Sequence, residues 1–252
     1  MMIIIKNAIR ERMRKKEIYV FAALGILLLL LFGGGSTTLQ INGVPVTDFS
    51  NMFGIMHGMV TVIGCLLALL ISLQTIPNEY ERRTSHLVWV RGISQTSYHT
   101  SLALANFLSG VIAVGILYMA LAVYVIGNGE TGVLIRMIPA FLILCINIGI
   151  ISLLTSVLSI KLPAAVSGLI GAIVVIGGLL YGILDTYRSI MGGITGSLLG
   201  MALRILPDFN QIRAQSTAIC KGGSIEWHGI LAGLLTIYIL SIGLVCLKRK
   251  EA

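Results

Sequence analysis

Few residues in the apolar parts of this chain carry groups that could do chemistry. His57 lies in one apolar stretch near Met52, Met56 and Met59, where it could line a substrate path or hydrogen-bond a neighbouring helix. An ionisable group inside a membrane span is a functional hypothesis by default, because its burial is costly. Methionine adapts to irregular apolar surfaces, which suits a hydrophobic or amphipathic ligand. We therefore name Met52, Met56, His57 and Met59 as candidate residues of a substrate path, with ordinary helix packing as the alternative.

The other reactive side chains form no catalytic pattern. An intramembrane serine protease would need Ser and His at the same membrane depth, and Ser197 has only His57 as a candidate partner. The close carboxylates Glu79 and Glu81 lie beside arginines, so ion pairing or partner contact explains them better than catalysis. No Asp or Glu falls in the middle of an apolar stretch, which disfavours ion-coupled carriers. The sequence predicts no catalytic residue and no enzyme.

The sequence also predicts no metal chemistry. The four cysteines have irregular spacing and form no CxxC pair, and three of them lie inside apolar runs as small hydrophobic residues. The remaining histidines are scattered along the chain: His86, His99 and His228. We expect no metal site and no cofactor held by this chain.

Composition places the chain in a membrane. Of its 252 residues 56% are hydrophobic and 11% charged, with a mean hydropathy of +0.96. A soluble domain carries roughly a quarter charged residues, so a soluble enzyme is excluded. The net charge of +8 could suggest a nucleic-acid partner. The positions of the charges fit membrane topology better, and we expect no nucleic acid.

Six stretches are apolar enough to cross a bilayer, which takes roughly 20 residues of helix. Five qualify by length, and a sixth, Ile18–Phe32, is slightly short. The sequence predicts an all-α integral membrane protein with six transmembrane helices in a single domain over residues 1–252. The five longer stretches are 52–76, 101–127, 133–160, 164–184 and 229–247.

Lys and Arg indicate the orientation, because cytoplasmic loops carry an excess of them. The segments before the first span, between the second and third, between the fourth and fifth, and after the last are rich in them. The loop 33–51 has none. Both termini are therefore expected on the cytoplasmic side. Most of the 18 basic residues lie in these segments: Lys6, Arg10, Arg12, Arg14, Lys15, Lys16, Arg82, Arg83, Arg91, Lys161, Lys248, Arg249 and Lys250.

With both termini on the cytoplasmic side, the number of spans must be even. This condition decides how residues 185–227 are interpreted. The part Ser189–Leu206 is apolar, but a seventh span would place the basic C-terminal segment outside. We interpret 185–227 as an outer insertion with a re-entrant helical hairpin, which protein contacts make tolerable at membrane depth. Gly192, Gly196 and Gly200 repeat every fourth residue, a seam that lets another helix approach closely. A glycine-rich loop is the alternative.

Residues 1–16 are expected to form an amphipathic helix at the cytoplasmic interface. Apolar residues recur at helical spacing, beginning with Met2 and Ile5. Lys6, Arg10 and Arg14 follow one another along a neighbouring face, toward anionic lipid headgroups. The helix is an anchor or, in the sharper interpretation, also a contact for a cytoplasmic partner.

The segment 77–98, between the second and third spans, combines charges of both signs with apolar side chains. Thr84 can cap a short helix, which Arg91 and the glycine after it would end. This composition suits docking of a soluble protein, with an amphipathic turn on lipid as the alternative. The candidate partner-binding residues are Glu79, Glu81, Arg82, Arg83, Thr84, Leu87, Trp89 and Arg91.

The same segment resembles the loop between the second and third spans of ABC-2 type transporter permeases. The predicted organisation of the whole chain also resembles theirs. Arg83 stands where that family often has glycine, and Gln95 where it often has arginine. The residues that carry the resemblance are Asn78-Glu79-Tyr80-Glu81-Arg82-Arg83-Thr84, Leu87-Val88-Trp89, Gly92-Ile93-Ser94-Gln95-Thr96 and Tyr98.

The resemblance implies a permease subunit whose coupling helix sits in a groove of a separate ATPase. The sequence has no G-x-x-x-x-G-K-[ST] phosphate loop, so ATP and Mg would be bound by the partner ATPase. A second copy or a sister permease would complete the transport cavity. We expect an exporter of a hydrophobic or amphipathic compound (a drug, an antimicrobial peptide or a lipid-like molecule) in the bacterial inner membrane. The alternative is a membrane protein that confers immunity or senses a peptide without transport.

Overall fold

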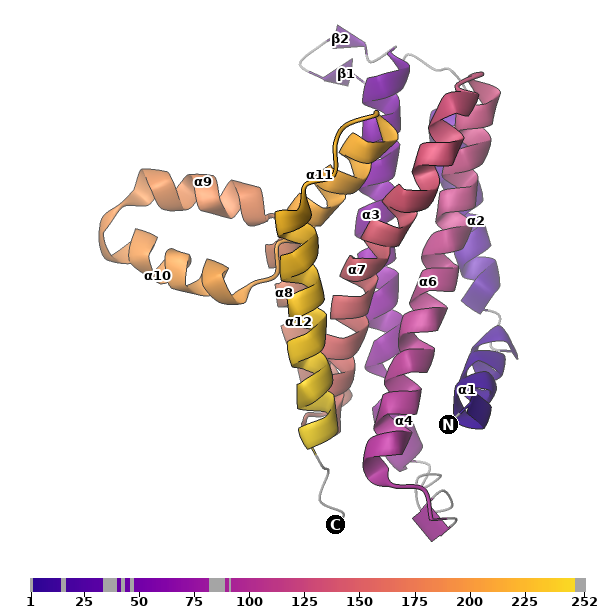
Figure 1. Cartoon of the computed structure of the whole chain (residues 1–252), viewed down its shortest axis with the longest axis vertical. Coiled ribbons are helices and arrows are strands. Elements are labelled where there is room, and N and C mark those ends of the chain that lie inside the picture. Colours follow the sequence, from indigo (N-terminus) through magenta and orange to yellow (C-terminus); the bar gives the residue numbers. More distant parts are fainter. Residues whose placement is uncertain are drawn as a thin grey trace.

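A computed structural model describes residues 2–14, 17–33, 40–41, 44–45, 48–81, 89–90 and 92–247. These residues form an elongated bundle of helices with one pair of helices extending sideways (Figure 1). Within the described ranges, four helical segments are long and apolar enough to cross a membrane, and a bent pair makes up to five. The all-helical, membrane-spanning class predicted from composition is therefore observed, while the count of six spans stays a prediction.

Three long helices make the centre of the bundle: α3 (Phe49–Leu73), α6 (Gln95–Gly127) and α7 (Thr131–Lys161). The apolar side chains of α6 and α7 follow no single face: some pack inside the bundle, and others, such as Met119 and Leu142, are exposed. Small residues let the backbones approach: a Cβ on Gly64 would lie 2.7 Å from Val114, and one on Gly110 would lie 2.7 Å from Ile148. The helix α4 (Thr75–Glu81) continues α3 after a break at Gln74.

The end of the bundle that carries α4, the α4 end, lies at the bottom of Figure 1. The opposite end carries a short antiparallel pair of strands, β1 (Gln40–Ile41) and β2 (Val44–Pro45), in whose register Ile41 pairs with Val44. We call it the β1–β2 end. The last long helix, α12 (Trp227–Cys246), runs down to the α4 end.

Two N-terminal helices pack on the outside of α6. The helix α2 (Glu17–Gly33) matches the sixth predicted span, and α1 (Met2–Arg14) lies near the α4 end. The predicted helix in residues 1–16 is observed, but its bundle-facing side includes Ile4 and Ala8. Met2, expected on the apolar face, is 85% exposed.

The fifth predicted span, 164–184, is not one continuous helix. The helix α8 (Ala164–Leu179) ends early, and α9 (Tyr181–Met191) leaves it at an angle of 74°. Packing explains the bend: a Cβ on Gly178 would lie 2.5 Å from both a Phe209 ring carbon and the Pro207 carbonyl oxygen. The segment before α11 thus lies directly against the end of α8, and the chain turns away.

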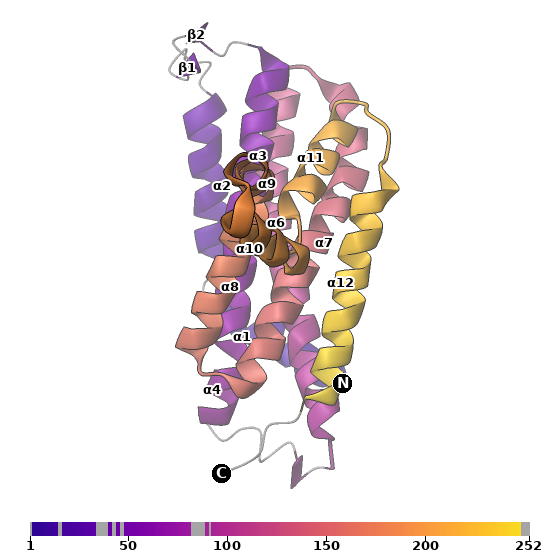
Figure 2. The same cartoon turned by 90° about the vertical axis from the view of Figure 1, so that its left-hand side faces the viewer.

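The predicted insertion 185–227 contains helices that project from the bundle, and Figure 2 views the projection end-on. The helix α10 (Gly193–Ile205) returns beside α9, and we call α9 and α10 the lateral arm. The turn between them has positive φ at Gly192 (52°) and Gly193 (58°), a backbone conformation that glycine adopts readily. The helix α11 (Phe209–Cys220) then packs back onto α7.

Asp208 begins α11 by accepting a hydrogen bond from the backbone N–H of Gln211 at 2.8 Å. Burial and the nearby charge of Asp185 raise the pKa of the Asp208 carboxyl above its usual range, against the lowering effect of that backbone bond. The lateral arm therefore joins the bundle beside the partly buried Asp208 carboxyl, which caps the N-terminus of α11.

Candidate functional site

The clearest concentration of polar contacts near the predicted coupling segment is at the α4 end. Tyr98 donates a hydrogen bond to the Glu79 carboxylate at 2.6 Å. The Tyr80 hydroxyl lies 2.7 Å from the His99 Nε2, and the Gln95 amide donates to the same hydroxyl at 3.0 Å. These contacts fasten α4 to the first turn of α6, and we call them the α4 clamp.

The chain between α4 and α6 is described only in part. Trp89 and Val90 are helical, and the Gly92 N–H donates to the Trp89 carbonyl at 2.8 Å. Gly92 has φ of 76°, the left-handed conformation that ends many helices. Ser94 then starts α6 by accepting from the Ser97 N–H at 3.3 Å.

The predicted partner-binding residues divide into three groups. Glu79 and Trp89 are half-buried: Glu79 is bonded within the chain, and the Trp89 ring lies 6.0 Å from the Tyr80 ring. Glu81 is exposed, and Val90, which follows Trp89 in the sequence, is 88% exposed. The predicted residues Arg82, Arg83, Thr84, Leu87 and Arg91 lie outside the described residues.

A second network joins α1 to the bundle close to the α4 clamp. The Arg12 guanidinium donates to the Thr75 hydroxyl at 2.5 Å and to the side-chain oxygen of Asn106. Thr75 also donates to Asn106 at 2.8 Å, and Asn106 donates to Ser156 at 3.0 Å. Asn106 is fully buried, so four helices are linked through one amide at depth.

Sequence reasoning missed several residues of these two networks. The signals are weak: Asn106 is one amide in a long apolar stretch, and Tyr80 and Tyr98 stand out only as residues of the resemblance to the permease loop. Arg12 was counted only as one of many basic residues. Its partners lie 63 and 94 positions away in the sequence. Only the packing of α1 against α6 brings them together.

His57 is fully buried and lies in a different cluster, nearer the β1–β2 end. Its Nε2 is 2.9 Å from the Tyr118 hydroxyl and 3.0 Å from the Ser216 hydroxyl, and its Nδ1 is 2.9 Å from the Thr217 hydroxyl. The ring thus joins α3, α6 and α11. The geometry favours the helix-linking role over an exposed path.

The hydroxyls around His57 also have backbone acceptors. The Thr217 hydroxyl lies 3.0 Å from the Arg213 carbonyl oxygen of its own helix as well as 2.9 Å from the His57 Nδ1. The Ser216 hydroxyl is bonded to the Ala140 carbonyl at 2.8 Å.

The Ser216–His57 pair therefore differs from a catalytic dyad. A nucleophilic serine gives its proton to the histidine and is reached by substrate, whereas both of these side chains are fully buried and Ser216 has a carbonyl acceptor. Ser197, the serine considered from the sequence, lines a cavity in the lateral arm instead. Among the described residues no three His, Cys, Asp or Glu side chains gather as metal ligands.

The three methionines predicted beside His57 differ in their placement. Met52 and Met56 are buried inside the bundle, while Met59 is 39% exposed. Met59 begins an exposed apolar stripe along α3 that continues through Val62, Leu66 and Leu70. We call these four residues the α3 stripe.

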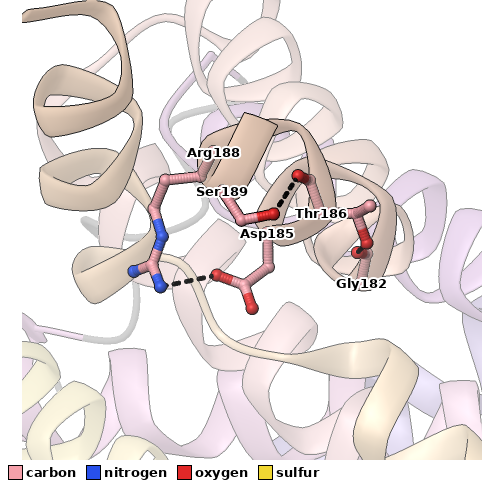
Figure 3. A network of polar contacts seen from close by, with 5 residues as sticks. All are labelled: Gly182, Asp185, Thr186, Arg188 and Ser189. Carbon is pink, nitrogen blue, oxygen red and sulfur yellow. Dashed lines mark hydrogen bonds and ion pairs between the residues drawn. The ribbon is translucent and has the colours of Figure 1, made fainter. Parts of the chain in front are cut away.

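The predicted glycine seam lies in the lateral arm. Gly192 occupies the turn, and Gly196 and Gly200 face α9, where a Cβ on Gly196 would lie 3.1 Å from the Arg188 carbonyl oxygen. Arg188 also forms an ion pair with Asp185 at 3.1 Å, beside Ser189 (Figure 3). The close approach of α9 and α10 thus uses the glycines that the sequence singled out.

Comparison with known proteins gives no relative for this chain: no family model, no curated protein and no solved structure matches it. Function must therefore be argued from the residues at the α4 end.

Proposed function

We propose that this chain is the transmembrane permease subunit of an ATP-driven ABC-2 type exporter. The subunit has six spans and an N-terminal interfacial helix, with both termini on the cytoplasmic side of a bacterial inner membrane. A separate ATPase binds ATP and Mg, and a second copy or a sister permease completes the path. The cargo is a hydrophobic or amphipathic compound.

The α4 clamp is the observation that carries the proposal. A coupling element must be held firmly to the spans that it moves, and must still present side chains to a partner. Glu79 and Tyr80 provide the first property through their bonds to α6. Glu81 and Val90 provide the second, because both are exposed. A protein interface has an apolar core and a polar rim, which an exposed valine and an exposed carboxylate can supply.

The rest of the bundle supports an apolar transport path. The α3 stripe presents four large apolar side chains along one face of a central helix. A second subunit placed against this face would enclose a path lined by apolar residues. The interior ionisable residue His57 is occupied by its hydroxyl partners, so it is not required for the path.

Co-purification with an ATPase tests the proposal. The affinity-tagged chain is expressed together with candidate ABC ATPase subunits of the same organism, and the ATPase bound per chain is measured. We expect Glu81→Lys and Val90→Asp to reduce the bound ATPase roughly tenfold, the effect of losing about 1.4 kcal/mol at an interface. Glu226→Lys, an exposed charge reversal at the other end, is the control. A wild-type chain that retains no ATPase contradicts the proposal.

Two further measurements complete the test. ATP-dependent export in vesicles separates a transporter from an immunity or peptide-sensing protein, which would bind its ligand without moving it. Orientation is read by impermeant maleimide labelling of Ser85→Cys and Ser224→Cys, in a background where exposed Cys246 is replaced by Ala. We expect Ser85→Cys to react only from the cytoplasmic face and Ser224→Cys only from the outer face. Labelling of Ser85→Cys from the outer face would refute the proposed contact between the segment 77–98 and a cytoplasmic ATPase.

A further inference from the structure

A cavity of about 350 Å³ lies at the root of the lateral arm, between the end of α10, the start of α11 and α12 (Figure 1). Its volume is within the range of small-molecule pockets, roughly 300–1,000 Å³. One part of its wall is apolar and includes Ile150 and Leu235. The other part carries polar side chains from four helices and the α10–α11 connection: Tyr181, Arg204, Asp208, Gln211, His228 and Thr236. Such a wall suits an amphipathic ligand.

Two opposite charges line this cavity without pairing with each other. Within the described ranges, neither Arg204 nor Asp208 forms an ion pair. The Asp208 carboxylate accepts hydrogen bonds only from backbone N–H groups at the start of α11. A ligand in the cavity therefore meets one guanidinium and one carboxylate, each free to bind a charge of its own.

The other charged residues of the lateral arm and α11 are engaged elsewhere. Asp185 and Arg188 form an ion pair with each other at 3.1 Å. Arg213 lies on the side of α11 that faces α3, where a Cβ on Gly58 would be 3.1 Å from its guanidinium. Burial and the nearby Asp185 raise the pKa of the Asp208 carboxyl, so a ligand cation beside Asp208 would stabilise its ionised form.

The apolar part of the wall continues onto the surface of α12. Leu235 lines the cavity and is 59% exposed, and Ile239 and Ile242 follow it at helical spacing and are exposed as well. His228 lies near the start of α12, roughly 10 Å from Leu235 at 1.5 Å per residue. The imidazole is therefore nearer the β1–β2 end than the apolar surface is, which is the order of head group and tail in one leaflet of a bilayer.

We propose that this cavity holds the head group of a zwitterionic membrane phospholipid, with its phosphate beside Arg204, its ammonium beside Asp208 and a tail along α12. Arginine binds phosphate oxygens through several N–H donors. A purely anionic lipid would leave Asp208 without a cation, and a purely cationic lipid would leave Arg204 without an anion. The inference goes beyond the proposed export function and depends only on the chain lying in a membrane.

Titration of the delipidated whole chain in detergent with dioleoylphosphatidylethanolamine tests the site, and native mass spectrometry counts the lipid bound per chain. We expect one high-affinity lipid per chain, with its affinity lowered roughly tenfold by Ala232→Phe, which fills the cavity. Ala214→Phe is the matched control, because Ala214 is an exposed alanine of α11 that does not line the cavity.

Two charge variants test the assignment of the head group. Asp208→Asn keeps a side-chain oxygen for the cap of α11 and removes the charge. We expect it to lower the affinity for phosphatidylethanolamine roughly tenfold and not to lower that for phosphatidylglycerol, which has a phosphate and no ammonium. Arg204→Gln is expected to weaken the binding of both lipids. Glu130→Gln and Lys161→Gln, exposed charges away from the cavity, are the controls.

Three results overturn the proposal: equal binding by Ala232→Phe and Ala214→Phe, equal affinity of the wild type for the two lipids, or equal loss in Asp208→Asn and Glu130→Gln. Displacement of the lipid by glycerophosphoethanolamine at the same concentration also contradicts it, because a soluble head group would then suffice. These measurements involve no ATPase, so their outcome is independent of the co-purification test.

Discussion

Single polar residues inside the bundle link several helices through hydrogen bonds. His57 joins three helices through the hydroxyls of Tyr118, Ser216 and Thr217, and Asn106 joins α1, α4, α6 and α7. In an apolar surrounding, leaving one such partner unsatisfied costs more than the bond contributes when made. This asymmetry makes a single interior amide a sensitive position.

We therefore expect Asn106→Leu to lower the free energy of unfolding by about 1–3 kcal/mol, because Arg12, Thr75 and Ser156 each lose a partner. Asn106→Asp keeps the acceptor for Arg12 and should recover most of that loss. The measurement is unfolding by denaturing detergent, followed by helical circular dichroism. Asn51→Leu, an exposed amide, is the control. Equal stability of the Asn106→Leu and Asn51→Leu variants would show that the network contributes nothing.

At the scale of elements, the bend between α8 and α9 decides where the lateral arm leaves the bundle. The sequence 164–184 is uniformly apolar, and nothing in its periodicity marks residue 179 as an end. The bend follows from the close approach of the Pro207 carbonyl and Phe209 to Gly178. A contact across about 30 positions cannot be deduced from local composition, which is why a continuous span was predicted there.

Gly178→Ala tests this explanation. The added methyl would lie 2.5 Å from a backbone carbonyl oxygen, which cannot rotate away as a flexible side chain could. We expect a loss of about 1–3 kcal/mol from overpacking. Gly115→Ala is the control, because its nearest neighbour, Phe141, would be 3.8 Å from the new methyl. The melting temperatures of the two purified variants are compared in a thermal shift assay. Equal melting temperatures would refute the explanation that close packing at Gly178 causes the bend.

The sequence was most informative about elements that depend on local composition. Each of the six apolar stretches contains a described helix, and the helix predicted in residues 1–16 is present. The segment 77–98 was identified from its mixed charges and Trp89. The hydrogen bonds of Glu79 and Tyr80 could not be predicted in the same way, because their partners lie on the next helix and share no local sequence pattern with them.

At the scale of the whole molecule, the lateral arm needs an apolar surrounding. It projects sideways from the bundle (Figures 1 and 2) and no residue of α9 is buried. Water would solvate such a surface poorly, so lipid chains or another subunit must cover it. Its large exposed side chains are Ile183, Tyr187, Ile190, Met191, Ile194, Leu198, Met201 and Ile205.

Ile194→Lys measures that surrounding. Ile194 is 82% exposed, so a lysine there breaks no internal contact. In hydrocarbon the charge costs about 2–3 kcal/mol, whereas on a wet surface it costs almost nothing. We expect the variant to unfold more readily in nanodiscs than wild type, and Ile225→Lys, near the β1–β2 end before α12, to match wild type. If Ile194→Lys also matches wild type, the arm lies in water.

One last consequence follows from the short break at Gln74. Because α3 and α4 are separated by a single non-helical residue, Phe49–Glu81 extends for roughly 50 Å as nearly one piece. Hydrogen bonds of the α4 clamp hold one end of this segment, and those of His57 hold it near the other end. Under the proposed function, a displacement of α4 by the ATPase would therefore move Phe49–Glu81 as nearly one segment and displace the residues around His57 at its other end.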